Sequence, residues 1–246
     1  MSSISPDIVT NGLVLCLDAA DKKSYSGSGT TWYDRSGEDN NGTLENDPTF
    51  STDGGGCLDF DGVDDYATTP YVIGAISMFT VSCWAKSAGA GGGNQCLMCD
   101  LASNGSNSSN RVFLSFYSDT IYVNMGDGSN YYYAINANTY DATSTLFDGN
   151  WHHVALTINA EIQKFYIDGV LVHTHDTTDS GTRSGGTSAV LGTAGTDDLT
   201  IGRYGEYSGA YWNGKIANFN AYQNRELSAA EVLQNFNAMK SRFGIT

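Results

Sequence analysis

Short apolar runs separated by turn-forming residues are the feature that most constrains this fold. The runs are about four to eight residues long and recur between clusters of Gly, Asn, Asp and Ser, a pattern typical of β-strands. We expect strands at Leu13–Asp18, Cys57–Asp61, Tyr66–Thr69, Phe79–Lys86, Cys96–Leu101, Val112–Tyr117, Ile121–Met125, Tyr131–Asn136, His152–Ile158, Gln163–Asp168, Val170–His175, Leu199–Arg203 and Lys215–Tyr222. Asp168 and Gly169 form a two-residue hairpin signal between two runs. The sequence therefore predicts an antiparallel β-sandwich.

Alternation within the strands predicts which side chains face the core. The clearest inward set is Phe79, Val81, Cys83 and Ala85, opposite Thr80, Ser82, Trp84 and Lys86 on a face that we expect to meet solvent. A second inward set is Val154, Leu156 and Ile158, followed after a turn by Phe165 and Ile167. One substantial helix is expected over residues 228–243, because Ser228 and Glu231 form a capping box before a helically spaced apolar stripe. We expect this helix to pack on the sandwich.

Length and charge limit the organisation of the chain and its partners. At 246 residues we expect a single domain over residues 12–246, preceded by a lead segment at residues 1–11. Twelve Lys and Arg against 27 Asp and Glu leave a net charge of −15, which repels nucleic acid and anionic membranes. No apolar run could span a bilayer, and no signal peptide is recognisable. We therefore expect synthesis in a cytoplasm.

The cysteines are expected to be reduced thiols. They number five, at positions 16, 57, 83, 96 and 99, and four of them lie in apolar strand-like runs. Cys96 and Cys99 form a CxxC motif that could also indicate a redox pair or half a zinc site. Residues three apart on a strand face opposite sides, and no second pair completes a metal set. We therefore predict neither a metal site nor a disulfide there.

Five segments, in this order, resemble concanavalin A-like laminin G domains. They are GLVLCLDAADKKSYSGSGTTWYDRSGEDNNGTL, CLDFDGVDDY, FTVSCWAK, WHHVALTINAEIQKFYIDGVLV and IGRYGEYSGAYWNGKIANFNAYQNRELSAAEVLQNFNAMKSRFG, which together extend from Gly12 to Gly244. Within that superfamily the chain is most similar to the single-domain forms in structural proteins of tailed bacteriophages. The resemblance implies an all-β fold, a two-sheet antiparallel jelly-roll sandwich with one C-terminal helix. It implies less about function, because this fold carries lectins, glycosidases and adhesion modules.

Catalytic constellations are weak in this sequence, so we expect no enzyme and no catalytic residue. Glucanases of the superfamily resemble one another in a strand with alternating acids, ExDxE or ExDxxE, and neither string occurs. Asp59 and Asp61 do alternate, but they run into a glycine turn. The histidines are His152, His153, His173 and His175, two adjacent pairs expected on neighbouring strands. No Ser or Cys lies in a nucleophile motif beside them.

Two polar loops have both a structural and a functional interpretation. Asp61, Gly62, Asp64 and Asp65 could supply calcium ligands, although we favour a β-turn capped by Asp64. The sequence predicts no cofactor, with calcium as the open alternative. The other loop contains Asp34, Ser36, Gly37, Asn40, Asn41 and Gly42, which we expect to be ordered by side-chain to backbone hydrogen bonds, with Trp32 as a packing anchor.

Clustered aromatic residues are the strongest binding signal. They are Tyr131, Tyr132 and Tyr133, and Tyr204, Tyr207, Tyr211 and Trp212 in a Gly-rich segment. At least one of three consecutive tyrosines on a strand faces away from the core. Aromatic faces stack on sugars and anchor protein interfaces. The alternative is that these side chains only cover the sheet and its rim within one protein.

The first functional hypothesis is a non-enzymatic bacteriophage virion protein, displayed on the capsid or tail. Its expected partners are other virion proteins, with host-surface glycans and self-association as open alternatives. A protein assembled in a host cytoplasm and released by lysis needs neither a signal peptide nor paired cysteines. A free carbohydrate-binding module is the second hypothesis and a glycosidase of the same fold the third. We expect localisation at the virion surface.

Overall fold

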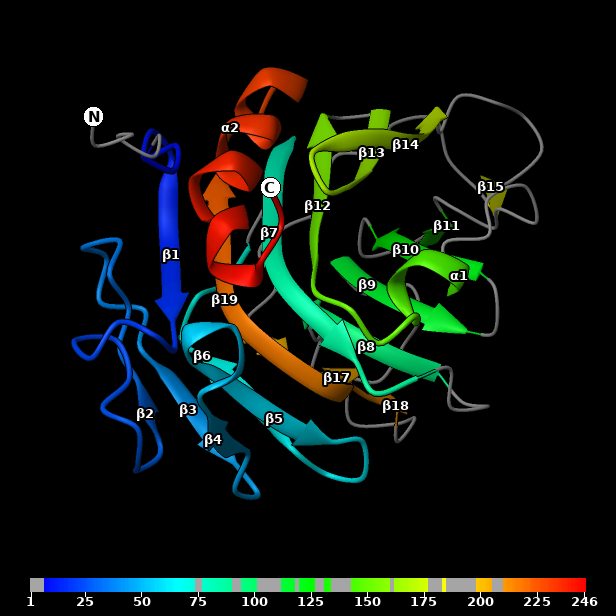
Figure 1. The fold of residues 1–246 in the computed structure, drawn as a ribbon. Helices are drawn as coiled ribbons and strands as arrows, with labels where there is room; N and C mark the ends of the chain where they lie inside the picture. The colour runs from blue at the N-terminus through cyan, green and yellow to red at the C-terminus, as the bar shows by residue number, and fades with distance from the viewer. Residues whose placement is uncertain are drawn as a thin grey trace.

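Two antiparallel β-sheets pack face to face, and a helix covers the outer face of one of them (Figure 1). The computed structural model describes residues 7–73, 77–89, 94–100, 112–117, 120–126, 131–133, 143–159, 162–176, 183–184, 198–204 and 210–246. The predicted fold class is confirmed: a mostly β, two-sheet jelly-roll sandwich with one C-terminal helix. Within the described residues, no helix has both the length and the apolar character needed to cross a membrane.

The first sheet has eight strands in the described part of the chain, in the order β14-β13-β12-β7-β19-β5-β4, with β1 paired to β19. Its strands are β1 (Leu13–Asp18), β4 (Thr49–Ser51), β5 (Cys57–Asp61), β7 (Met78–Ser87), β12 (His152–Asn159), β13 (Ile162–Ile167), β14 (Val170–Asp176) and β19 (Asn213–Gln223). The long strand β19 occupies the centre, because β7 lies on one side of it and β5 and β1 share the other.

The second sheet has nine strands by the same count, in the order β15-β11-β10-β9-β8-β16-β6-β3-β2. They are β2 (Thr31–Trp32), β3 (Gly42–Glu45), β6 (Tyr66–Thr69), β8 (Asn94–Asp100), β9 (Val112–Tyr117), β10 (Thr120–Gly126), β11 (Tyr131–Tyr133), β15 (Arg183–Ser184) and β16 (Leu199–Ile201). A separate two-stranded hairpin joins β17 (Arg203–Tyr204) to β18 (Ala210–Tyr211). The remaining elements are α1 (Thr143–Leu146), α2 (Ala229–Met239) and the 3-10 helices η1 (Asp53–Gly55) and η2 (Lys240–Phe243).

Most predicted strands occur within two residues of their expected bounds. β1, β5, β6 and β9 match the prediction to the residue. The strand expected at Leu199–Arg203 is instead divided at Gly202, and the short strands β2, β3, β4, β15 and β18 were not predicted. The hairpin at Asp168 and Gly169 is confirmed, because both residues have positive φ, 51° and 77°, as that turn requires.

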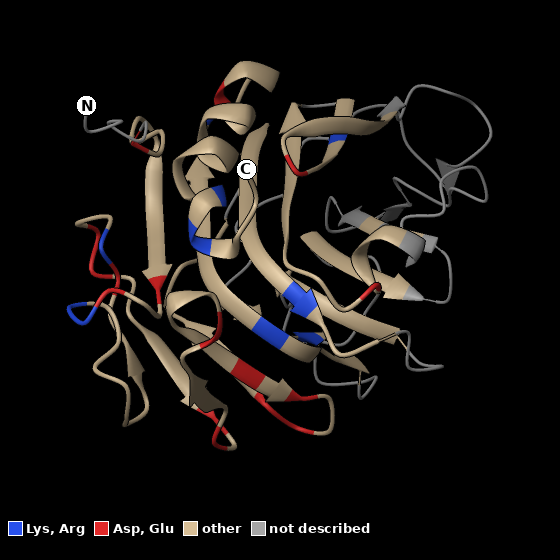
Figure 2. Cartoon of the chain, viewed as in Figure 1, with Lys and Arg blue, Asp and Glu red and all other residues tan. Residues whose placement is uncertain are grey.

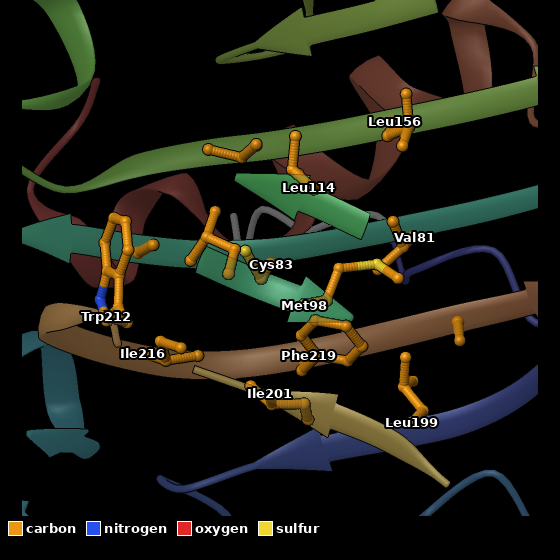
Figure 3. Packing of buried hydrophobic residues seen from close by; sticks show 14 of the residues in the cluster. Val81, Cys83, Met98, Leu114, Leu156, Leu199, Ile201, Trp212, Ile216 and Phe219 are labelled. Atoms are coloured by element: carbon orange, nitrogen blue, oxygen red, sulfur yellow. The ribbon is translucent and has the colours of Figure 1, made fainter. Parts of the chain in front are cut away.

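The core lies between the sheets and contains both predicted inward sets. Phe79, Val81 and Cys83 on β7 belong to the same buried cluster as Leu156 and Phe165. Figure 3 shows the facing strands: Met98, Leu114 and Ile201 of the second sheet meet Val81, Cys83 and Phe219 of the first. Alternation thus predicted the inward faces correctly.

The opposite face of β7 does not meet solvent as predicted. Thr80, Ser82 and Trp84 are all buried, because α2 and η2 cover this outer face. The Trp84 ring stacks on Phe243 at 4.1 Å and on Phe236 at 5.6 Å between ring centroids. Alternation predicted a solvent-facing row, but the C-terminal segment buries this row, and Trp84 joins an apolar cluster with Phe236 and Phe243.

The predicted C-terminal helix is confirmed with a changed end. Ser228 accepts a hydrogen bond from the Glu231 backbone N–H, and the Glu231 side chain accepts one from Ser228 in return, as in the expected capping box. The α-helix ends at Met239, however, and the last four residues of the predicted span form the 3-10 helix η2. The lead segment also packs here: Val9 is buried and donates its N–H to Asn235 Oδ1 at 2.8 Å.

Cys96 and Cys99 do not face opposite sides of their strand, contrary to the prediction. A β-bulge between Cys96 and Met98 changes the pairing register of β8 with β9. An extra residue in one strand reverses the alternation beyond it. Both sulfur atoms therefore lie with Phe113 on the outer face, while Leu97 and Met98 enter the core. All five cysteines belong to the described part of the chain, and none of them forms a disulfide.

Candidate functional site

The predicted aromatic residues do not form a single surface. Tyr131–Tyr133 lie on β11, and two strands, β10 and β9, separate that strand from β8. The hairpin that carries Tyr204 and Tyr211 packs on β8 instead. Tyr207 and the side chains of Tyr131–Tyr133 lie outside the described residues, so their role stays a prediction.

Trp212 was predicted as a binding residue, and the structure corrects this assignment. Its side chain is 2% exposed and belongs to the main core cluster. Its indole lies 6.2 Å from the Phe116 ring and 6.3 Å from the Phe147 ring, between centroids. Figure 3 shows it pointing inward from the beginning of β19. The residue faces the core because the chain passes from the outer β17–β18 hairpin into the sheet at this position.

Gly202 allows the hairpin to leave the second sheet. It follows β16 directly, with φ at +84°, and a Cβ there would lie 3.0 Å from the Phe60 ring. Its carbonyl accepts the Trp212 backbone N–H at 2.8 Å, and its own N–H donates to the Leu97 carbonyl at 3.0 Å. These bonds fix the start of the hairpin, so that Arg203 and Tyr211 pair across it.

Arg203 lies between two tyrosine rings, an arrangement that the sequence analysis missed. Its guanidinium carbon is 4.7 Å from the Tyr66 ring centroid and 5.9 Å from that of Tyr211. Within the described residues Arg203 forms no ion pair, and its Nε is buried without a hydrogen-bond partner. Since the side chain as a whole is only half-buried, other guanidinium N–H groups can reach a ligand. The available signal was an arginine inside an aromatic segment of a chain with few basic residues.

Tyr204 belongs to the sheet cover rather than to an open surface. It is half-buried and packs on the outer-face cluster of Cys96, Cys99 and Phe113. Its ring meets that of Phe113 edge to face, with centroids 4.7 Å apart. The alternative interpretation, that these aromatics cover the sheet, therefore holds for Tyr204, whereas Tyr211 contributes to the arginine site.

The turn between β5 and β6 is acidic (Figure 2), and it leads into β6, whose Tyr66 ring contacts Arg203. Asp65 directly precedes Tyr66, and Asp61 pairs with Asn213, two residues after Tyr211. Asp61 caps the turn, not Asp64 as predicted: its Oδ1 accepts the backbone N–H groups of Val63 at 2.7 Å and Asp64 at 3.2 Å. We call Tyr66, Arg203, Tyr211 and the turn Asp61–Asp65 the rim site.

The charge state of the rim site varies among its carboxyls. The backbone N–H groups hold the pKa of Asp61 below its usual value. Burial raises the pKa of Asp65 to about 6, supported by the charges of Asp61 and Asp64 and opposed by a hydrogen bond from the Asp61 N–H. Oxygen atoms of Asp61, Asp64 and Asp65 lie within 4.8 Å of one another. Such a group could hold a calcium ion through carboxylate oxygens, and the turn geometry explains the same residues without one.

The loop around Asp34 serves a structural role, as predicted. The Asp34 carboxylate accepts the backbone N–H groups of Cys16 at 2.8 Å, Ser36 at 2.9 Å and Asn40 at 3.1 Å. Trp32 is fully buried in the core and anchors the loop. Every oxygen of this acid is therefore engaged in ordering the chain.

The histidines do not form two pairs on neighbouring strands, which corrects the prediction. His152 and His153 lie on β12 and His173 on β14, with β13 between them. His152 Nδ1 lies 2.8 Å from Asp168 Oδ2, and Nε2 lies 3.2 Å from Asp148 Oδ1. Burial alone would lower the pKa of His152, but these two carboxylates outweigh it and raise the pKa. The side chain therefore links two loops through its contacts with Asp148 and Asp168.

We expect His153 to make the protein sensitive to mild acid. It is 2% exposed, and burial lowers its pKa to about 4, although the Asp168 charge opposes this shift. Between that value and about 6.5 the unfolded chain binds a proton that the folded chain does not, so stability falls as pH falls. The His153→Phe variant should lack this contribution, up to about 2–3 kcal/mol at pH 4. Urea unfolding of both proteins across this pH range measures the difference, and parallel pH profiles would contradict the prediction.

Comparison with known families identifies the superfamily. A model for laminin G-type domains, described as the concanavalin A-like lectin/glucanases superfamily, matches residues 61–233. The chain belongs to this superfamily. The match contains the whole acidic turn, Arg203 and Tyr211. No curated protein matches the sequence.

Several solved structures share the fold at low sequence identity. The receptor binding domain of a botulinum neurotoxin C/D mosaic serotype has a TM-score of 0.63 at 17% identity and covers 93% of this chain and 51% of that chain. Botulinum neurotoxin type C, whose cell entry is dependent upon interaction with two ganglioside molecules, has a TM-score of 0.66 at 14% identity. The match covers 94% of this chain and 52% of that chain. The binding domain of Paraclostridial Mosquitocidal Protein 1 has a TM-score of 0.59 at 15% identity, and the match covers 93% of this chain and 52% of that chain. This chain thus spans about half the length of the structures it matches.

The superfamily includes glucanases, and β5 carries two candidate acids, Asp59 and Asp61. Asp59 lies 3.4 Å from Lys215 Nζ, and that ammonium also lies 3.6 Å from Asp53. Asp61, the next outward-facing acid on the strand, is engaged by the turn amides. Both carboxylates therefore have ionic or hydrogen-bonding partners inside the protein.

Proposed function

We propose that this chain is a recognition domain that binds carbohydrate at the rim site and does not hydrolyse it. The observation that carries the proposal is Arg203, fixed between the rings of Tyr66 and Tyr211 with hydrogen-bonding capacity left over. Sugar hydroxyls both donate and accept hydrogen bonds. Arg203 supplies donors, the exposed carboxylates of Asp61 and Asp64 supply acceptors, and the tyrosines supply flat apolar surface.

The superfamily and the structural neighbours support a binding role. The superfamily takes its name in part from lectins. Botulinum neurotoxin type C interacts with gangliosides, which are glycolipids, and the other two structures named above are binding domains. Because about half of each toxin domain lies outside the match, the neighbours indicate a class of ligand and no particular subsite. A non-catalytic role agrees with the internal partners of Asp59 and Asp61.

We expect the Arg203→Gln variant to lose carbohydrate binding while keeping its fold. Hydrogen bonds to a charged group contribute about 1.5–3 kcal/mol, so affinity should fall roughly tenfold or more. The wild-type chain should bind at least one neutral oligosaccharide on a glycan array that also displays sialylated glycans. Isothermal titration with that oligosaccharide then compares the variants, and the melting temperature checks the fold.

Arg35→Gln is the matched control, because Arg35 is an exposed arginine that pairs with Asp21 away from the rim site. It should bind like the wild-type chain, whereas Tyr211→Ala should weaken binding. An array on which no glycan binds would refute the proposal. So would binding that survives both Arg203→Gln and Tyr211→Ala.

The setting of this activity is a second proposal, a virion surface with other virion proteins as partners. The five cysteines without a disulfide support it, because such thiols suit a protein folded in a reducing compartment. The resemblance to bacteriophage structural proteins agrees with it. Co-sedimentation of the purified chain with phage particles, compared with the same particles lacking it, is the direct test.

A further inference from the structure

A cavity of about 470 Å³ lies on the outer face of the first sheet, on the side of the lead segment. Its floor is the paired strands β1 and β19, where Cys16 lies opposite Asn220 and Asp18 opposite Asn218. Met239 at the end of α2 and Ile8 of the lead segment form its walls. This volume lies within the range of small-molecule sites. The cavity is separate from the rim site, because the rim site lies near the beginning of β19, where that strand pairs with β5.

Asn220 is the feature of this cavity that points to a bound ligand. Its neighbours Phe219 and Ala221 point into the core, so the Asn220 side chain points outward to the cavity. Asn220 is 1% exposed, and within the described residues its Oδ1 has no hydrogen-bond partner. Across the strand pair on β7, the buried Ser82 hydroxyl lacks a partner as well. A buried unpaired carbonyl is destabilising, so a donor from outside would restore a lost interaction.

The charges at the cavity favour a positively charged donor. The lining contains two carboxylates, Asp7 and Asp18, and no lysine or arginine. Asp18 already has partners, because Arg242 donates to its Oδ1 at 2.8 Å and the Ala20 N–H donates to the same oxygen at 2.9 Å. Asp7 is exposed and has no ion pair within the described residues. Burial and the Asp18 charge raise the pKa of the Cys16 thiol to about 12, so this sulfur stays uncharged. The charged residues of the lining are both acidic, so an anion would be repelled there.

The remaining surface of the cavity is apolar. Met239 and Ala238 come from α2, and Ile8 faces them from the lead segment. A methionine thioether adapts its shape to aliphatic partners. The cavity thus combines an apolar wall with one buried acceptor and a carboxylate at its mouth.

We propose that this cavity binds a small primary ammonium compound with a short alkyl chain. The ammonium group donates to Asn220 Oδ1 and lies within the field of Asp7 and Asp18, and the alkyl chain packs along Met239 and Ile8. The competing occupant is ordered water, which would satisfy Asn220 without selecting for charge.

Butylammonium chloride is the probe, and 1-butanol is its neutral match. Titration followed by nuclear magnetic resonance should show saturable shifts of the Asn220 side-chain amide, with a dissociation constant of about 1 mM that rises with salt. Butanol should bind at least tenfold more weakly. Equal binding of the two probes, or no saturable shift with butylammonium, would overturn the proposal in favour of water.

Two variants test the assignment of residues. Asn220→Leu removes the unpaired acceptor at similar size and should weaken butylammonium binding at least tenfold, whereas Asn94→Leu, an exposed position on β8, should not. Asp7→Asn changes an exposed side chain and leaves the fold intact even if Asn220→Leu does not fold. It should weaken binding several-fold and reduce its salt dependence. Unchanged affinity in Asp7→Asn and in folded Asn220→Leu would place the ligand elsewhere and refute the site.

Discussion

Replacing Trp212 by Ala should lower the free energy of unfolding by about 3–5 kcal/mol, the range for truncating a large core aromatic. Trp212 is 2% exposed and packs between Phe116 and Phe147. Urea unfolding of the variant measures the loss. Trp212→Phe should cost much less, because it keeps most of the ring and removes an indole N–H that has no partner among the described residues.

The neighbouring residue provides the control for this experiment. Tyr211→Ala removes a half-buried ring of the rim site and should reduce stability far less than Trp212→Ala. If Trp212→Ala instead kept the melting temperature and lost carbohydrate binding, the residue would belong to the surface, and the packing described here would be wrong.

Replacing Gly214 by Ala should cost about 4 kcal/mol or prevent folding. Gly214 lies in β19 with φ at +140°, and a Cβ there would lie 2.3 Å from the Lys86 carbonyl oxygen and 2.9 Å from the Ala88 nitrogen. Both contacts are with backbone, so relief requires β19 to move away from β7. Soluble yield and chemical unfolding measure the effect.

Gly149→Ala separates backbone strain from the close contact. Gly149 also has positive φ, +81°, but a Cβ there would meet nothing within 4 Å. We expect a loss of about 1–2 kcal/mol, the cost of the left-handed conformation alone. Equal losses in the two variants would show that the approach of β7 to β19 is looser than described.

Local patterns predicted the strands well because they depend on neighbouring residues. The bounds of β5 and β9 follow from apolar runs between turn residues, and the Asp168–Gly169 hairpin follows from its two positive φ values. Alternation on β7 likewise separated Phe79 and Val81 from the opposite face. It could not indicate what covers that face, so the burial of Trp84 under η2 was missed.

The candidate site depended on contacts between distant segments, which a local pattern does not encode. Arg203 meets Tyr66 because β6 and β16 pair in the sheet, and nothing near either residue in the sequence predicts that pairing. The bulge at Cys96 is a comparable case, since one extra residue in β8 places both cysteines on the same face, where opposite faces were predicted. Proximity in the sequence was likewise misleading for Trp212. This residue directly follows Tyr211 of the rim site, but its own side chain is buried in the core.

The position of β19 also bears on how the chain folds. This strand joins β1, β5 and β7, and its register brings Leu17 to Phe219 and Leu15 to Ala221. Such pairings between the two ends of a chain close very long loops, which makes folding slow relative to helical proteins of similar size. Until β19 is in place, three strands expose unpaired edges that can join those of another chain. Correct folding therefore requires β19 to pair with these three strands before their edges pair with another chain.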